Sequence, residues 1–232
     1  MIEPKKPKNV LRPAEECLLA LESQGLGKKL SIGGAFGLAY YLEYRPTHDV
    51  DAWWEPSAGE EDRRKVVRCL REALSRFGET RARSWGDVVS VELQESGKVV
   101  FSFQIARRSG QLEESREAPW PPHILLDSFK DLVAAKMVAL VERGAPRDFR
   151  DIHALCEAGL ADPRSCWILW KERRLLAGDD TSPSRARLAL LTHLKRIELQ
   201  RPLPKIADPH QRIGAEHLRA WFREEFLNGL VD

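Results

Sequence analysis

The chain has 232 residues, of which 43% are hydrophobic and 31% are charged, so it is not a disordered protein and can bury a substantial core in one or two domains. A net charge of +2 is too small to indicate nucleic-acid binding by itself, and four scattered cysteines form no zinc or disulfide pattern, as is typical of a reducing compartment. No apolar run is long enough to span a membrane and no signal-peptide core is evident, so we expect a cytoplasmic protein without a membrane partner.

The amino-terminal third is predicted to alternate helices and short strands. Proline in a first turn, apolar residues at helical spacing and glycines at the ends indicate the helices. Short apolar runs bounded by turn residues indicate the strands. The predicted elements are a helix over 13–24, a strand over 30–32, a helix over 35–43, a strand over 48–54 and a helix over 57–77.

Two carboxylates lie on the strand predicted over 48–54, in the pattern D-x-D. Side chains alternate between the two faces of a strand, so Asp49 and Asp51 are expected on one face, about 7 Å apart. Val50 and Ala52 then point the other way, into the core. Carboxylate oxygens are the hard ligands that Mg²⁺ prefers, and Mg²⁺ usually keeps the rest of its shell for water and phosphate oxygens.

Two adjacent glycines, Gly33 and Gly34, stand between the strand over 30–32 and the following helix. Glycine has no Cβ, so backbone N–H groups at this turn can approach phosphates closely. Together with the two carboxylates, the turn is suited to holding a metal ion and a nucleoside triphosphate.

The middle of the chain is predicted to form a hairpin, a polar loop and then helices only. A turn of four polar residues, 94–97, joins the two strands of the hairpin. The predicted elements are strands over 87–93 and 98–105, a loop over 107–123, a helix from Asp127 or Ser128 to 143, a helix from 147, and helices over 163–176, 182–199 and 211–228.

Two charged residues of the helical part lie where apolar residues are expected. Lys136 is on the apolar face of its helix, which is costly unless an anion meets it or its stem reaches the surface. Asp148 points inward and needs a partner: it would pair with Lys136, order Arg147, or act as a general base. Asp151 is predicted to form an i,i+4 ion pair with Arg147.

A run of patterns resembles a known family. The two glycines, a helix and then R-x-T-x-D-x-D, with Arg45 and Thr47 ahead of the two aspartates, resemble motif I of the polymerase-β-type nucleotidyltransferases, and among them the AbiEii/AbiGii toxin branch. D-L-x-A-x-K, ending at Lys136, is similar to the lysine helix of that family, and R-D-x-x-D over 147–151 follows it. The resemblance covers roughly residues 28 to 158.

The resemblance implies an α/β fold: a polymerase-β-like nucleotidyltransferase core with a small mixed sheet, followed by a helical carboxy-terminal region. We place the core at 1–125 and the helical domain at 126–232. The superfamily often carries a third metal-binding carboxylate on the neighbouring strand, where this chain has Gln104. Glu92 can substitute for it or can be an ordinary solvated strand carboxylate, so one or two metal ions remain open.

The resemblance also implies an activity. A nucleoside monophosphate would pass from an NTP to a tRNA 3′ end or a protein hydroxyl, in the toxin of a toxin–antitoxin pair. Asp49 and Asp51 would hold Mg²⁺ or Mn²⁺, with Asp148 acting at the acceptor. The nucleotide-binding residues implied are Gly33, Gly34, Arg45, Thr47 and Lys136.

Two other classes of function stay open. Gln104 in place of a carboxylate favours a catalytically silent member of the fold that binds a nucleotide or a partner. An excess of ten Lys/Arg over four Asp/Glu between residues 164 and 205 is compatible with a non-enzymatic RNA-binding or antitoxin-like module. Salt-sensitive RNA binding that survives loss of both aspartates would support the second class.

Overall fold

A computed structural model describes residues 2–230 of the chain. The chain forms two compact units, Met1–Leu132 and Val133–Asp232, and the boundary falls inside helix α4 (Phe129–Glu142). Each unit is described by itself below.

In the residues that the structure describes, the first unit contains one sheet, three α-helices and one 3₁₀ helix ahead of α4. Its elements are α1 (Arg12–Ser23), η1 (Gly27–Lys29), β1 (Leu30–Ile32), α2 (Gly34–Ala39), β2 (Asp49–Trp54), α3 (Glu60–Leu74), β3 (Glu79–Trp85), β4 (Val88–Glu95), β5 (Lys98–Ala106), β6 (Arg116–Glu117) and β7 (Leu125–Leu126).

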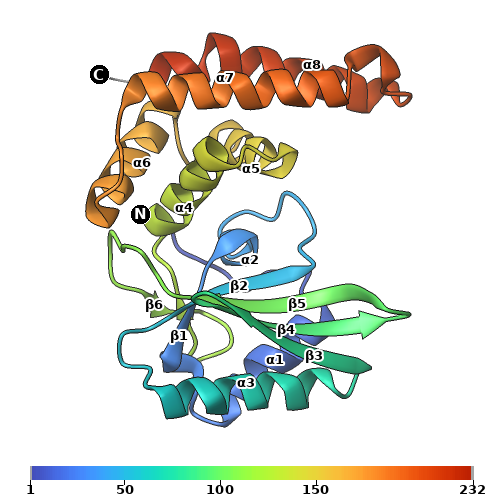
Figure 1. The fold of residues 1–232 in the computed structure, drawn as a ribbon, viewed down its shortest axis with the longest axis vertical. Helices are drawn as coiled ribbons and strands as arrows, with labels where there is room; N and C mark the ends of the chain where they lie inside the picture. The colour runs from blue at the N-terminus through green and yellow to red at the C-terminus, as the bar shows by residue number, and fades with distance from the viewer. Residues whose placement is uncertain (1, 231–232) are drawn as a thin grey trace. The chain divides into compact units, whose positions relative to one another are not determined.

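The seven strands form a single mixed sheet in the order β3-β4-β5-β2-β1-β7-β6. β2 runs parallel to β5 and β1 parallel to β7, and the other neighbours are antiparallel. Helices α1 and α3 lie beside each other below the sheet in the view of Figure 1. The mixed sheet and the helical carboxy-terminal region confirm the predicted fold class.

The local rules explain the central elements well. Along β2 the exposure alternates, with Val50, Ala52 and Trp54 buried and the aspartates half-buried. The hairpin of β4 and β5 closes through Ser96 and Gly97, which both have positive φ (51° and 74°), as a two-residue turn with the twist of a hairpin requires. The buried side chains between the sheet and the two helices form the core of this unit.

Three features differ from the sequence prediction. Strand β3 was not predicted, because six of its seven residues are exposed and it has no apolar face to reveal it. The two-residue strands β6 and β7 were not predicted either. Helix α2 ends at Ala39 rather than near residue 43, since the chain turns there and the side chain of Glu43 instead accepts hydrogen bonds from the amino-terminal arm at Lys8 and Asn9.

The second unit is helical throughout its described residues, as predicted. Beyond α4 its elements are α5 (Pro146–Glu157), α6 (Pro163–Ala177), α7 (Pro183–Gln200), η2 (Leu203–Lys205), α8 (Pro209–Glu224) and η3 (Phe226–Gly229). Proline begins all four of the later α-helices, where its missing N–H costs nothing. Among the residues described, no helix has the length and apolar character needed to cross a membrane.

Candidate functional site

The glycine turn packs directly on the strand that carries the aspartates. The N–H of Gly33 donates to the backbone oxygen of Asp51 at 2.8 Å. Gly34 has φ +61°, and a Cβ there would lie 2.2 Å from Oδ2 of Asp51. A Cβ on Gly33 would lie 2.4 Å from Nε1 of Trp53. Both positions therefore require glycine, and the glycines bring the backbone at the start of α2 against the Asp51 carboxylate.

The two aspartates have the geometry predicted for them. Asp49 and Asp51 are half-buried on the same face of β2, whereas Val50 between them is fully buried. Two oxygen donors beside a turn without side chains suit Mg²⁺, which takes few protein ligands and keeps water or phosphate oxygens. Across residues 2–230, no three His, Cys, Asp or Glu side chains are grouped to hold a metal ion, and the role of Asp49 and Asp51 as metal ligands stays a prediction.

The neighbouring strands extend the polar face of β2. In the sheet register Asp51 lies opposite Gln104 of β5, so an amide occupies the position where a third carboxylate was sought. The Gln104 amide donates to Oγ of Ser102 at 3.3 Å. Glu92 of β4 lies opposite Ser102 on the same face, is 7% exposed, and its Oε2 has no hydrogen-bond partner. The prediction of Glu92 as a solvated strand carboxylate is therefore wrong.

The two residues that precede the aspartates in the motif lie in the loop between α2 and β2. The guanidinium of Arg45 lies over the ring of Tyr44 at 5.7 Å and donates to the carbonyl of Pro46 at 3.4 Å. Thr47 is half-buried. These contacts are local to the loop, and the nucleotide-binding role of both residues stays a prediction.

A buried arginine that the sequence did not reveal supports the glycine turn. Arg108, whose side chain is 9% exposed, binds Oδ1 of Asp127 at 2.6 Å and also donates to Oγ of Ser31. Its guanidinium lies 6.0 Å from the ring of Trp53. Burial raises the pKa of Asp127 above its ordinary value, while Arg108 opposes the rise. Asp127 reaches the glycine turn, since a Cβ on Gly33 would lie 3.3 Å from its Oδ2.

The start of α4 anchors the polar loop that follows β5. Ser128 is the helix cap, because its Oγ accepts from the N–H of Asp131 at 3.0 Å. The Asp131 carboxylate accepts from the backbone N–H groups of Leu112 and Glu113 at 2.9 and 3.0 Å. Of the two predicted caps, Ser128 is confirmed, and Asp127 binds Arg108 instead.

In the second unit, the predicted lysine is buried and paired. Nζ of Lys136 lies 2.7 Å from Oδ2 of Asp151, and the two side chains are 10% and 0% exposed. The buried position of Lys136 confirms the helical pattern, but its stem does not extend to solvent. The predicted pair between Asp151 and Arg147 is wrong, because the carboxylate of Asp151 faces α4 across the helix pair and meets Lys136 there.

Asp148 is also buried and paired, with a different partner from those predicted. Both of its oxygens are held by Arg143, at 2.6 and 3.0 Å, and Oδ2 also accepts from the N–H of Ala145 at 2.9 Å. Its side chain is 0% exposed. Neither Lys136 nor Arg147 is its partner. Arg143 therefore occupies both oxygens of Asp148, and this contact joins the residue after α4 to the first turn of α5.

The model of the family described as nucleotidyl transferase AbiEii toxin, of type IV toxin–antitoxin systems, matches residues 16–220. The chain belongs to the AbiEii family. No curated protein matches the sequence.

The AbiEii match spans both units and includes every motif described above. Within the first unit, the structure brings Gly33, Gly34 and Asp51 together, with Asp49 on the same strand face. Within the second, it joins Lys136 to Asp151. Arg108 was not predicted from the sequence, because its partners Ser31 and Asp127 lie 77 and 19 residues away along the chain and no local pattern links them to it.

Proposed function

We propose that this AbiEii-family chain is a metal-dependent nucleotidyltransferase that moves a nucleoside monophosphate from an NTP to an acceptor hydroxyl. The observation that carries the proposal is the contact between Gly34 and Asp51: a glycine with φ +61° lets the backbone at the start of α2 pack directly against the carboxylate that is proposed to bind the metal. In the reaction the acceptor oxygen bonds to the α-phosphorus, the bond to the β-phosphate oxygen breaks, and pyrophosphate leaves.

The residues of the glycine turn and β2 divide the work. Asp49 and Asp51 would hold Mg²⁺ or Mn²⁺, which would supply positive charge to the phosphates when bound. Gly33 and Gly34 let the backbone approach the triphosphate, and the Arg108–Asp127 pair behind Gly33 keeps the turn in place. Reactions of this kind depend mostly on positioning and charge stabilisation, so few side chains are needed.

Lys136 is proposed to meet the charge of the triphosphate. Asp151, at 2.7 Å, would fix the ammonium group in position, so the pair acts in nucleotide binding as one unit. Arg45 and Thr47 are proposed as further nucleotide contacts. We do not propose Asp148 as general base, because Arg143 holds both of its oxygens.

The acceptor and the biological partner follow from the family alone. We propose a tRNA 3′ end or a protein hydroxyl as acceptor, in the cytoplasm, with the activity opposed by a cognate antitoxin. The competing model of an RNA-binding module with basic carboxy-terminal helices is weakened by the structure. Several of those arginines contact other residues of the second unit: Arg174 pairs with Glu142, Arg185 with Asp180, and Arg196 donates to the carbonyl of Arg143.

The test is transfer of label from each α-³²P-NTP to total RNA and total protein with Mg²⁺ or Mn²⁺. The Asp49→Asn/Asp51→Asn variant should lose at least about 100-fold in rate, because it removes the charged metal ligands but keeps their shape. Asp87→Asn, an exposed aspartate of the β3–β4 turn, is the matched control and should keep full activity. Equal labelling by wild type and the double variant would refute the metal site.

One observation favours a second candidate, a nucleotide-binding protein without transfer activity. Gln104 lies opposite Asp51, so the site lacks a carboxylate on β5. This candidate predicts saturable, Mg²⁺-dependent NTP binding, lost in the Asp49→Asn/Asp51→Asn variant, with no labelled product from any NTP.

A further inference from the structure

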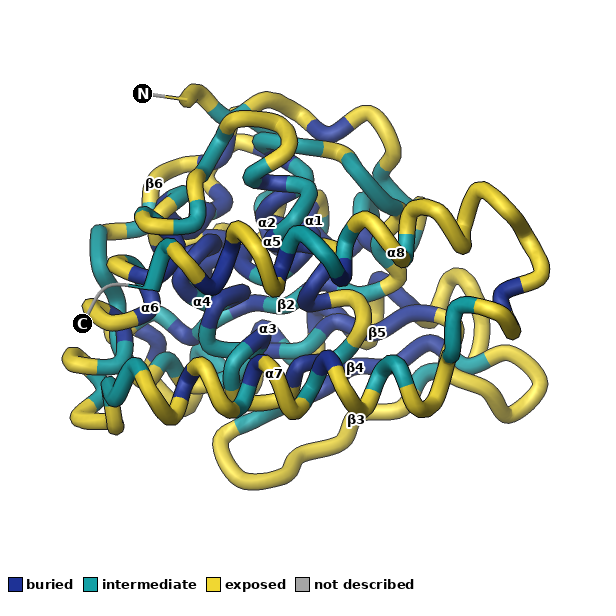
Figure 2. Tube along the Cα trace, turned by 90° about the horizontal axis from the view of Figure 1, so that it is seen from above, coloured by how far each residue is buried: buried dark blue, intermediate teal, exposed yellow. Residues whose placement is uncertain are grey.

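Strand β3 is an open edge of the sheet in the first unit. It is last in the strand order and pairs with β4 alone. Six of its seven residues are exposed, and in Figure 2 the trace of β3 is exposed along most of its length. Within the described part of the chain, no backbone group of Glu79–Trp85 bonds to another backbone group outside the β3–β4 ladder. β3 therefore presents to solvent a row of backbone donors and acceptors about 23 Å long.

Two arginines on one face of β3 have no partner. Arg81 and Arg83 alternate with the residues that face α3, so they project from the opposite face of the sheet. Both are exposed, and across residues 2–230 neither side chain forms a hydrogen bond or an ion pair. Glu92 lies opposite Arg81 in β4, but it is 7% exposed and its Oε2 has no hydrogen-bond partner. The charge that this face of the edge shows to solvent is therefore positive.

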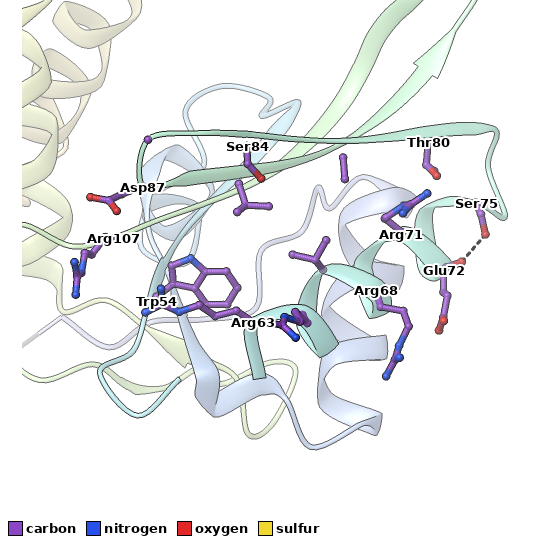
Figure 3. A pocket seen from close by; sticks show the side chains of 15 residues that line it. Trp54, Arg63, Arg68, Arg71, Glu72, Ser75, Thr80, Ser84, Asp87 and Arg107 are labelled. Carbon is purple, nitrogen blue, oxygen red and sulfur yellow. Dashed lines mark hydrogen bonds between the residues drawn. The ribbon is translucent and has the colours of Figure 1, made fainter. Parts of the chain in front are cut away.

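A basic groove lies on the other face of β3. It has a volume of about 810 Å³ and lies between α3 and the β3–β4 hairpin. On the β3 side it is lined by the small residues Thr80, Ala82 and Ser84, and Figure 3 shows Thr80 and Ser84 pointing into it. Five arginines and two carboxylates are among the other lining residues, and Arg71 of α3 reaches toward Thr80 in the same view. The groove therefore has room for the side chains of a further strand, and its walls are positively charged.

These features fit a protein segment that is extended and carries Asp or Glu side chains. Such a segment can pair with β3 through its backbone, as an eighth strand of the sheet, and its side chains then alternate between the two faces. On one face they lie beside Arg81 and Arg83, and on the other they enter the groove that Arg71 lines. A nucleic acid can meet the arginines, but it has no backbone that completes a strand ladder.

A second copy of this chain fits the same edge poorly. If two β3 strands paired antiparallel over their full length, Arg81 of one copy would lie opposite Arg83 of the other, on both sides of a central Ala82 pair. Like charges that lie directly opposite one another destabilise a strand pair. The two arginines therefore disfavour pairing of β3 with itself and favour an acidic strand.

We propose that β3 docks an extended acidic segment of a partner protein, which adds to the edge of the sheet and places carboxylates beside Arg81, Arg83 and Arg71. The inference goes beyond the proposed function and does not depend on it, because none of these arginines is assigned a role in nucleotidyl transfer.

The test combines synthetic peptides with hydrogen–deuterium exchange of the full chain. The probe is a fluorescein-labelled peptide of three Glu-Glu-Val repeats, which has carboxylates on both faces when it is extended. It should slow the exchange of the amides of residues 79–85, because N–H groups at the edge gain acceptors. A peptide of three Glu-Glu-Pro repeats has the same charge. It should bind at least about 5-fold more weakly by anisotropy and protect β3 little, since proline cannot donate a ladder hydrogen bond.

Three variants locate the charge contacts of the Glu-Glu-Val peptide. Arg81→Gln/Arg83→Gln should weaken its binding roughly 2- to 30-fold, because two cross-strand charge pairs are lost. Arg71→Gln should weaken binding roughly 1.5- to 5-fold, because one exposed charge pair is lost. Arg150→Gln/Arg212→Gln removes two exposed arginines of the second unit, so it is the matched control and should keep wild-type affinity. Circular dichroism checks that each variant retains the fold.

Several outcomes would overturn the proposal. Equal binding of the Val and Pro peptides, equal loss of affinity in the control variant, or unchanged exchange of residues 79–85 would reduce the effect to general charge attraction. Protection of β3 that rises with protein concentration in the absence of peptide would mean that a second copy covers the edge. Equal protection by a seven-nucleotide oligouridylate, which has the same number of charges as the peptide, would assign the arginines to nucleic acid.

Discussion

Two pairs of aspartates in this protein differ in burial and in their ion-pair partners. Asp49 and Asp51 on β2 are half-buried beside a turn that has no side chains. Asp148 and Asp151 on α5 are completely buried, and each lies within 2.7 Å of a cation. From the sequence, Asp49, Asp51 and Asp148 were candidates for function, whereas Asp151 was predicted to form a structural ion pair with Arg147.

The difference shows how burial separates chemistry from structure. A charged carboxylate that is buried away from water needs a cation as its partner, and the resulting ion pair holds neighbouring segments of the chain together. The β2 aspartates are only half-buried, and they are the residues proposed to hold a metal ion. The comparison predicts that substitution of the α5 aspartates lowers mainly stability, with an additional effect on nucleotide binding through Lys136, whereas substitution of the β2 aspartates lowers mainly activity.

The largest effect on stability is expected for Asp151→Ala. It would leave the ammonium of Lys136 buried without its partner, which costs about 3–5 kcal/mol of unfolding free energy. Urea denaturation followed by circular dichroism measures it. A loss below about 1 kcal/mol would mean that the pair is solvated in the folded protein.

A double variant separates the structural role of Lys136 from its proposed role in nucleotide binding. Lys136→Met/Asp151→Leu replaces the pair by apolar side chains and should recover most of the stability lost in Asp151→Ala. If Lys136 contacts the triphosphate, the double variant will bind NTP with lower affinity than the wild type, even though its stability is restored. Wild-type NTP affinity in the double variant would remove Lys136 from the site.

Gly34→Ala should be the next largest change, and it acts on the β2 side of the comparison. The new Cβ would meet Asp51 in a backbone conformation with φ +61°, so we expect a loss of about 2–4 kcal/mol together with loss of transfer. Gly97→Ala is the control, since φ is +74° there but the space around it is open. It should cost only about 1 kcal/mol and keep activity.

A smaller effect is expected at Asp162, an exposed carboxylate that caps α6. Its side chain accepts from the N–H of Ser165 at 3.0 Å, and this bond lowers the pKa of Asp162 below its ordinary value of 3.8. A group with a lowered folded pKa stabilises the protein above its ordinary pKa and loses that contribution as pH falls through the lowered value. Asp162→Ala should therefore cost about 1 kcal/mol at pH 7 and progressively less below pH 3.8. Denaturation at pH 7 and pH 3 tests this; an equal loss at both would refute it.

The smallest effect on stability is expected at Asp49, the residue whose loss should strongly impair activity. Asp49→Asn should change the unfolding free energy by less than about 0.5 kcal/mol, because the side chain is half-exposed on the strand. A large loss of stability would place Asp49 with the α5 pair and weaken the contrast.

Much of the fold was predictable, because it follows from local rules. The alternation of β2, the hairpin of β4 and β5, and the prolines that begin the later helices each lie within a few residues of sequence. Strand β3 escaped because an exposed edge strand has no apolar period to detect.

By itself, the sequence determined the glycine turn, the shared face of Asp49 and Asp51, and membership of the AbiEii family. Only the tertiary structure decided which charged side chains form ion pairs or hydrogen bonds with each other. It paired Lys136 with Asp151, gave Asp148 to Arg143, and brought Arg108 to Ser31 across 77 residues. The physical reason is that alternation and helical period fix the direction of a side chain, whereas the partner that it meets depends on which distant segment packs against it.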